Sequence, residues 1–290
     1  MQFDSYYEPT TVTECIQMLD DCGPDGRLLA GGTDLVYQLK KRTLKVKAVI
    51  SLQAVADLGR VDRTGEGIHI GAMARLADLS RSAALVGPWR LVGKGAGHVS
   101  SMQIRNTATI GGNCCNASPS ADTAPPLIVL DAMVTIANAG GKRVLPLDRF
   151  FVGPGQTALQ QGEIVTGFTL PNFGPRNGTA YKKYAIRGDT DITIVGVGAR
   201  LKLAAGGQIE EARLALGSVA PTPLRVPKVE SMLVGYKLTE ELAAEAGAVA
   251  AAACQPITDG RATKAYRREM VRIWTRHALL EAYEQAAKAY

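Results

Sequence analysis

The sequence is poor in the residues that usually hold metal ions. Its 290 residues include three histidines and five cysteines, and the cysteines form no C-x-x-C pair. The adjacent Cys114 and Cys115 lack the spacing of a usual zinc or iron–sulfur site. We therefore expect reduced thiols and no metal ion held by this chain.

The common nucleotide-binding motifs are also missing. No G-x-G-x-x-G follows a predicted strand, and no G-x-x-x-x-G-K-[ST] occurs. The segment Gly93-Lys94-Gly95-Ala96-Gly97 has a superficially similar composition, but it lies far from a strand-to-helix junction. We interpret it as a turn, so a dinucleotide bound by this chain needs a different architecture.

Long apolar runs and a secretory leader are absent as well. Residues 1–7 have neither a basic nor an apolar region, and no uninterrupted apolar stretch could cross a bilayer, so we expect a cytoplasmic protein. The net charge is +6, and the densest basic stretches lie at 40–47 and 261–276. They indicate solvated surfaces or a docking site for an acidic partner, whereas the lack of interleaved aromatic residues argues against nucleic-acid binding.

Two glycine pairs are the most informative feature that is present. Gly31-Gly32 follows a predicted short strand at 27–30, and Gly111-Gly112 follows a run at 103–110 that is typical of a strand or strand end. A glycine pair at such a junction lets the backbone approach a ligand, and its N–H groups can form a nest for a phosphate. Two pairs predict a clamp around a diphosphate, and FAD is the dinucleotide that we favour.

A polar run follows the second pair in otherwise apolar surroundings: Asn113, Asn116, Ser118, Ser120 and Asp122. Amide and hydroxyl groups can donate to phosphate oxygens, and a carboxylate can accept from a ribose or ribityl hydroxyl. The same residue types form turns, so a purely structural loop is the alternative.

The order of predicted elements indicates a mixed α/β fold in two domains. We place the first at 1–175, with subdomains at about 1–55 and 56–175, and the second at 176–290. A strand–turn–helix–strand order predicts a parallel pair in the first subdomain. In the second domain we expect three antiparallel strands and two helices, at 179–186, 192–203, 209–216, 239–253 and 262–287.

Two adjacent lysines lie in the first of these three strands. Alternation along a strand puts Lys182 and Lys183 on opposite faces, so one can face solvent while the other points at a cleft. A positive charge beside a flavin favours its reduced form. Lys183 is therefore a candidate for the flavin edge, with an ordinary surface lysine as the alternative.

Several segments together resemble one known family, the FAD-binding medium subunits of the molybdenum hydroxylases of the xanthine dehydrogenase and carbon monoxide dehydrogenase type. The segments that carry this resemblance are Leu29-Ala30-Gly31-Gly32-Thr33-Asp34-Leu35, Gln103 to Asn113, Ala117-Ser118-Pro119-Ser120-Ala121-Asp122, Gly153-Pro154-Gly155, Tyr184-Ala185-Ile186-Arg187, Ala220-Pro221-Thr222-Pro223 and Tyr266-Arg267-Arg268. They span nearly the whole chain.

The resemblance implies a fold and a cofactor site. The N-terminal domain would have two α/β subdomains, as in the vanillyl-alcohol oxidase-like flavoproteins, and the C-terminal domain a three-stranded antiparallel sheet with helices. Both glycine segments would line the pyrophosphate, while Lys183 and Ile192 would lie near the isoalloxazine ring. The candidate cofactor-binding residues are Leu29, Ala30, Gly31, Gly32, Thr33, Asp34, Leu35, Thr109, Ile110, Gly111, Gly112, Asn113, Ser118, Asp122, Val165, Lys183 and Ile192.

The same resemblance implies an electron-transfer subunit without a catalytic acid or base of its own. Substrate oxidation would occur on a molybdopterin-binding large subunit, and electrons would pass through two 2Fe-2S clusters of a small subunit to FAD here. NAD⁺ or another acceptor would then receive them, in a dimer of heterotrimers. Purines, nicotinate-like heterocycles and carbon monoxide are open as substrates, with the purine or N-heterocycle branch favoured.

Two other functions fit the sequence. The first is a self-contained flavin oxidase of the vanillyl-alcohol oxidase type, which often links its flavin covalently through histidine or cysteine. His98, Cys114 and Cys115 are the candidates for such a link. The second is a non-catalytic nucleotide-binding module.

Overall fold

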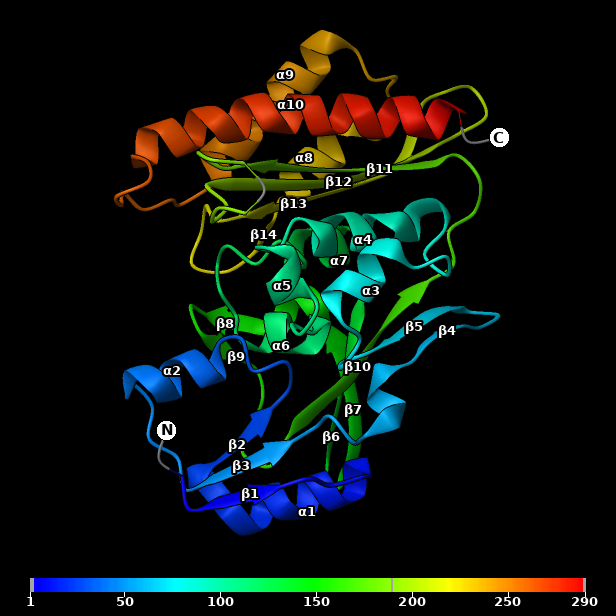
Figure 1. The fold of residues 1–290 in the computed structure, drawn as a ribbon. Coiled ribbons are helices and arrows are strands. Elements are labelled where there is room, and N and C mark those ends of the chain that lie inside the picture. Colours follow the sequence, from blue (N-terminus) through cyan, green and yellow to red (C-terminus); the bar gives the residue numbers. More distant parts are fainter. Residues whose placement is uncertain (1–2, 189, 289–290) are drawn as a thin grey trace.

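The computed structural model describes residues 3–188 and 190–288. Figure 1 shows three layers of structure along the molecule, from the N-terminal end through a central body to the C-terminal helices. A three-stranded sheet lies at the first end, a five-stranded sheet lies centrally, and a four-stranded sheet lies at the other end. This mixed α/β arrangement confirms the predicted fold class.

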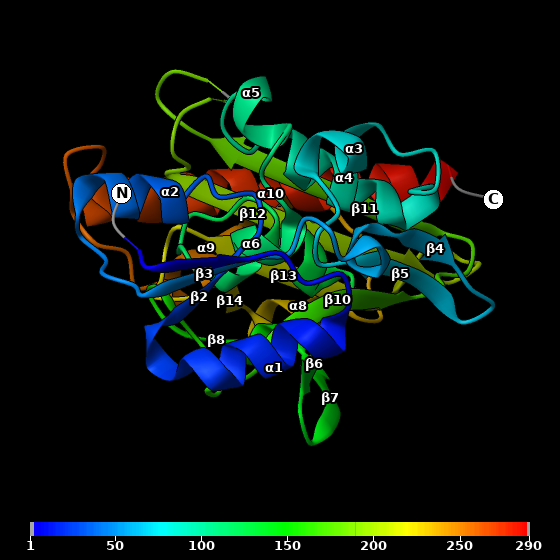
Figure 2. The ribbon, with the colours of Figure 1, turned by 60° about the horizontal axis from the view of Figure 1, so that its bottom comes forward.

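The N-terminal end is a parallel sheet between two helices. Its elements are β1 (Ser5–Tyr7), α1 (Val12–Cys22), β2 (Gly26–Leu29), α2 (Leu35–Lys41) and β3 (Ala48–Ser51). β3 pairs in parallel with both β1 and β2, so the predicted pair is extended to three strands. Val49 packs in the cluster that includes α2, and Ile50 packs in the cluster that includes α1. The two helices therefore cover opposite faces of the sheet (Figure 2).

The central body surrounds a five-stranded antiparallel sheet in the order β4-β5-β10-β6-β7. Its elements are β4 (Val61–Arg63), β5 (Gly67–Gly71), α3 (Leu76–Arg81), α4 (Arg90–Gly97), α5 (Met102–Arg105), α6 (Ile110–Cys115), α7 (Ala124–Val129), β6 (Met133–Asn138), β7 (Gly141–Pro146), β8 (Phe151–Gly153), β9 (Gln156–Thr157) and β10 (Ile164–Pro171).

The run before the second glycine pair forms no strand, so the strand predicted there is wrong: residues 102–105 form α5, and Thr109 makes an isolated bridge with Arg75. The Ser101 hydroxyl caps α5 by accepting from the Ile104 N–H at 3.4 Å. The Arg105 guanidinium donates to the carbonyls of Val99 and Ser100 at 3.0 and 2.6 Å. These local hydrogen bonds satisfy the backbone of a short helix and its entry loop, and they outweigh the strand-like composition of the run.

The glycine-rich segment 93–97 is also helical, and the turn predicted there is wrong. It forms the second half of α4, where the glycines allow close helix packing. A Cβ on Gly93 would lie 2.9 Å from the Leu79 carbonyl oxygen, and one on Gly95 would lie 2.7 Å from Cγ of Pro126. Packing against α3 and α7 thus offsets the poor helix propensity of glycine.

The C-terminal part has an antiparallel sheet in the order β11-β12-β13-β14, with helices on both faces. Its elements are β11 (Asn177–Tyr184), β12 (Val195–Leu203), β13 (Ile209–Gly217), β14 (Leu224–Arg225), α8 (Pro227–Leu233), α9 (Glu240–Ala253) and α10 (Lys264–Lys288). The three long strands confirm the prediction, and the two-residue β14 is an addition. α10 lies on β11 and β12, while α4 and α7 contact the sheet from the central body (Figure 1).

Candidate functional site

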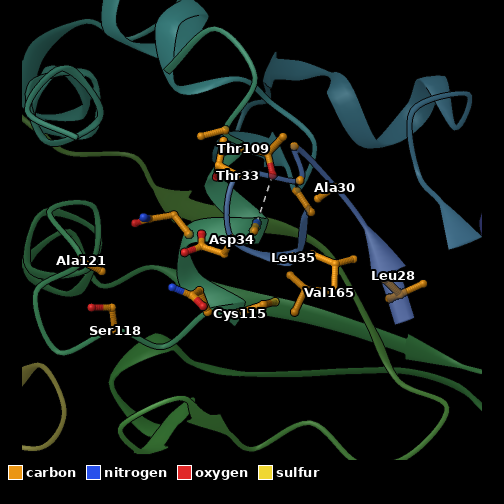
Figure 3. Close-up of a pocket in the computed structure, with 18 of the residues that line it drawn as sticks. Leu28, Ala30, Thr33, Asp34, Leu35, Thr109, Cys115, Ser118, Ala121 and Val165 are labelled. Atoms are coloured by element: carbon orange, nitrogen blue, oxygen red, sulfur yellow. Dashed lines mark hydrogen bonds between the residues drawn. The ribbon is translucent and has the colours of Figure 1, made fainter. Parts of the chain in front are cut away.

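A cavity of about 1010 Å³ runs between the N-terminal sheet, the central body and the C-terminal domain. Both glycine pairs line it, together with Val165 of β10 and Ile192 of the loop before β12. Figure 3 shows Leu28 and Val165 on one side of this space and Ser118 and Ala121 on the other, with Thr33 and Asp34 between them. Its volume is at the upper end of the roughly 300–1,000 Å³ typical of small-molecule sites, as an elongated dinucleotide requires.

The first glycine pair brings two loops into backbone contact. A Cβ on Gly31 would lie 2.0 Å from the Thr107 carbonyl oxygen, so no side chain fits there without moving the loops apart. Gly32 has a φ of +74°, which is strained for residues other than glycine. Gly31 is therefore required because the loops touch, and Gly32 because of its backbone conformation.

The first loop also presents free hydrogen-bond donors to the cavity. In the described part of the chain, the backbone N–H groups of Gly31, Gly32, Thr33 and Asp34 have no backbone acceptor. Successive donors around a left-handed residue form a concave nest that suits an anion. The N–H groups of 31–34 are therefore free for the phosphate nest predicted from the sequence, which stays a prediction.

The second glycine pair is arranged differently, because its N–H groups are already engaged. The Gly111 N–H donates to the Ala72 carbonyl at 2.8 Å, and the Gly112 N–H donates to the Thr109 hydroxyl at 3.1 Å (Figure 3, dashed). A Cβ on Gly111 would lie 2.6 Å from the Ala72 oxygen. The second pair thus packs the start of α6 against the backbone of Ala72, and the prediction of a free backbone nest on both sides is wrong for this side.

Asp122 and Thr193, which line the cavity, belong to a hydrogen-bonded network. The Asp122 carboxylate accepts from the Tyr181 hydroxyl at 2.7 Å, the Thr193 hydroxyl at 2.6 Å and the Lys183 ammonium at 2.9 Å. Lys183 also donates to the His98 carbonyl at 2.8 Å, and its side chain is 2% exposed. Burial, followed by the Asp122 charge, raises the pKa of Tyr181 well above its ordinary value, so the phenol remains a donor.

This network crosses between the two parts of the chain that were predicted as domains. Asp122 belongs to the central body, whereas its three partners belong to the C-terminal part. Lys182, the neighbour of Lys183, pairs instead with Glu281 on α10. The predicted alternation of the two lysines is therefore confirmed, and the buried one faces the central body.

The predicted site residues fall into two groups. Leu29, Ile110 and Lys183 do not line the cavity in the described structure: Leu29 packs with the cluster of α2, Ile110 is fully buried in the central core, and Lys183 lies behind Asp122. The remaining candidates line it: Ala30, Gly31, Gly32, Thr33, Asp34, Leu35, Thr109, Gly111, Gly112, Asn113, Ser118, Asp122, Val165 and Ile192.

The sequence missed other parts of the cavity wall. The residues of the wall that were not predicted include Leu28, Gln38, Met73, Cys115, Thr157, residues 160–164 and Thr193. They lie in β2, α2, α6, β9, the start of β10 and connecting loops, where no motif distinguishes them from core or turn positions. The adjacent pair Cys114-Cys115 was noticeable in the sequence, but only the orientation of α6 decides which of the two residues lines the cavity.

The candidates for a covalent flavin link are poorly arranged for it. The Cys114 thiol is buried against Thr123, and the His98 ring lies edge-on to Tyr181 with 5.8 Å between ring centroids. Cys115 lines the cavity, but burial raises the pKa of its thiol to about 12. Because the thiolate is the nucleophile, such a cysteine reacts slowly near neutral pH.

An ion pair at the cavity wall makes the stability of the fold depend on pH in the acid range. The Arg143 guanidinium donates twice to the buried Glu163 carboxylate, at 2.7 and 2.6 Å, and these bonds hold the pKa of Glu163 below its ordinary value of 4.5. A depressed carboxylate pKa stabilises the fold at neutral pH, and this contribution is lost as pH falls below 4.5.

We therefore expect Glu163→Gln to lower the free energy of unfolding by about 2 kcal/mol at pH 7, where a charged hydrogen bond is lost. The difference from the parent chain should shrink as pH falls below 4.5. Urea unfolding between pH 3 and 7 measures both, and a difference that stays constant with pH contradicts the assignment.

Comparison with known proteins identifies the family. Residues 1–173 match the FAD-binding domain in molybdopterin dehydrogenase, and residues 179–282 match the carbon monoxide dehydrogenase flavoprotein C-terminal domain. The chain belongs to the FAD-binding medium subunits of the molybdenum hydroxylases. The resemblance found in the sequence is thereby confirmed.

Relatives of this medium-subunit family match over nearly their full length. The xanthine dehydrogenase FAD-binding subunit of Escherichia coli O157:H7 is 31% identical, covering 98% of this chain and 97% of that protein. A carbon monoxide dehydrogenase structure from Hydrogenophaga pseudoflava superposes with a TM-score of 0.94 at 30% identity, covering 98% of each chain. Quinoline 2-oxidoreductase from Pseudomonas putida 86 superposes with a TM-score of 0.92 at 27% identity, covering 99% of each chain.

None of the helices within residues 3–188 and 190–288 is long and apolar enough to cross a membrane.

Proposed function

We propose that FAD binds in the cavity with its diphosphate at the free N–H groups of 31–34. The observation that carries this proposal is that, among residues 3–188 and 190–288, these N–H groups have no backbone acceptor and belong to residues that line a cavity of dinucleotide size. A diphosphate there would satisfy donors that have no backbone acceptor in the described part of the chain. Asn113 and Ser118, which also line the cavity, would orient the phosphates and sugar, and the Thr109 hydroxyl would hold the start of α6 in place through Gly112.

The role of the other wall residues follows from their chemistry. Val165, Leu28 and Met73 would exclude water from apolar parts of the cofactor. Asp122 and Ile192 would contact it at the C-terminal end, and Lys183 would act through Asp122. When bound, FAD supplies the electron-transfer chemistry, and this chain supplies binding and electrostatics.

We further propose the place of this chain in a complex. A molybdopterin-binding large subunit would oxidise a substrate of the purine or N-heterocycle class, and a small subunit with 2Fe-2S clusters would deliver electrons to this chain. NAD⁺ or another acceptor would receive them, in a cytoplasmic dimer of heterotrimers. The support is the full-length similarity to a xanthine dehydrogenase FAD-binding subunit and to carbon monoxide dehydrogenase.

We also retain the division into domains at 1–175 and 176–290 as a proposal. The support is the segment between β10 and β11, which is rich in proline, glycine and asparagine, as linkers are. It connects the last strand in sequence of the central sheet to the first strand of the C-terminal sheet.

Flavin uptake by the purified full chain tests the function. We expect one FAD per chain, an absorption spectrum that bleaches on reduction with dithionite, and complete release of the flavin on denaturation. A folded chain that takes up no FAD contradicts the proposal. Flavin that stays attached after denaturation favours the self-contained oxidase, and FAD that binds but is never reduced favours the non-catalytic module.

A second test concerns the complex. Co-expression with the neighbouring reading frames should yield a co-purifying molybdopterin-binding subunit and a 2Fe-2S subunit. Electron transfer to NAD⁺ is then measured with purine and N-heterocycle substrates. If the complex reduces other acceptors but not NAD⁺, then NAD⁺ is excluded as its electron acceptor.

A further inference from the structure

Two sequence motifs remain without a function in the cavity as described. Tyr266-Arg267-Arg268 begins α10, and Ala220-Pro221-Thr222-Pro223 follows β13. Neither lines the cavity in the described structure. Arg267 and Ser218, which lie in or beside these motifs, nevertheless contact two segments that line the cavity.

Arg267 is a buried cation with three partners. Its guanidinium donates to the Ile194 carbonyl at 2.7 Å and to the Ser218 carbonyl at 3.2 Å, and it pairs with Asp259 at 2.9 Å. The side chain is 4% exposed, and its Nε has no hydrogen-bond partner among the described residues. Burying an arginine is costly, so its presence at this place calls for a role.

Ser218 joins the two cavity walls. Its hydroxyl donates to the Thr193 carbonyl at 2.6 Å, in the segment that presents Ile192. Its N–H donates to the Pro119 carbonyl at 2.7 Å, in the loop that presents Ser118 and Asp122. Ser218 has a φ of +66°, a conformation that the contacts on both sides maintain.

The contacts form a continuous path from α10 to the cavity. Arg267 fixes Ile194 and Ser218, Ser218 fixes Thr193 and Pro119, and the Thr193 hydroxyl donates to Asp122. We propose that Arg267 and Ser218 are positioning residues, which hold the 192–194 segment and the 118–122 loop in register against the bound cofactor. The inference rests on the proposed FAD site.

The test uses three variants of the full chain. Arg267→Lys keeps a cation but cannot reach two carbonyls and a carboxylate in one fork. Ser218→Gly removes the hydroxyl while tolerating the positive φ. Arg272→Met is the control on α10, since Arg272 is 47% exposed and pairs with Glu269 one turn away on the same helix.

We expect Arg267→Lys and Ser218→Gly to weaken FAD binding about tenfold, one factor of ten being 1.4 kcal/mol, and to change the visible circular dichroism of the bound flavin. Arg272→Met should change neither. A merely structural role would lower the unfolding midpoint of the FAD-free chain and leave the affinity and spectrum of the folded fraction unchanged, which overturns the proposal. If Arg267→Lys does not fold, Ser218→Gly decides alone. Absence of FAD binding by the parent chain would instead refute the cofactor site itself.

Discussion

Gly32→Val is expected to abolish retention of FAD, with an affinity loss of at least about 100-fold. A β-branched residue at a φ of +74° is strained by roughly 1–3 kcal/mol, and its Cβ would lie 3.0 Å from Cδ1 of Leu29 and 3.2 Å from Cγ2 of Val36. The loop must therefore change conformation, and its N–H groups would no longer converge on one phosphate. Flavin content after purification and titration of the FAD-free chain measure the effect.

A matched control keeps this result interpretable. Gly59→Val introduces the same side chain where φ is ordinary and where no atom lies within 4 Å of the new Cβ. It should retain the flavin content of the parent chain. If Gly32→Val also retains FAD at the parent level while folding normally, the phosphate nest at 31–34 is refuted.

Lys183→Met is expected to lower the free energy of unfolding by about 3 kcal/mol, because it leaves the buried Asp122 carboxylate without its cation. The hydroxyls of Tyr181 and Thr193 still donate to that carboxylate, so the chain should fold and bind FAD. The midpoint potential of the bound flavin should become more negative, since an uncompensated negative charge next to the cavity disfavours added electrons.

The double variant Asp122→Asn/Lys183→Met separates pairing from packing. Removing both charges should recover part of the lost stability and return the potential toward that of the parent chain. Urea unfolding and spectroelectrochemistry measure the two quantities. Strictly additive stability losses would show that the two side chains do not act as a pair.

The first glycine loop shows how far sequence reasoning reaches. Gly31 and Gly32 were predicted to let the backbone approach a phosphate, and within the described residues the N–H groups of 31–34 have no backbone acceptor. This was predictable because a short strand, two glycines and a polar turn are local features. The assignment of the loop to a phosphate remains a prediction that the Gly32→Val variant tests.

The second loop shows where such reasoning fails. Gly111-Gly112 has the same local composition, but contacts with Ala72, a residue far away in the sequence, engage the N–H of Gly111. Lys183 is a similar case, because strand alternation placed it on the inward face correctly and yet could not show that Asp122 stands between it and the cavity. Neither of the two segments that meet in such a long-range contact shows in its own sequence that it will meet the other.

The sequence alone was sufficient for the family, the mixed α/β class and the residue types of the site, because these depend on local motifs and on periodicity along the chain. Only the tertiary structure decided which glycine pair offers free donors and which packs a helix. It also decided that Arg267 and Ser218, outside the cavity, connect its two walls. The physical reason is that a hydrogen-bond donor can be used once, and which acceptor takes it depends on segments that meet only when the chain is folded.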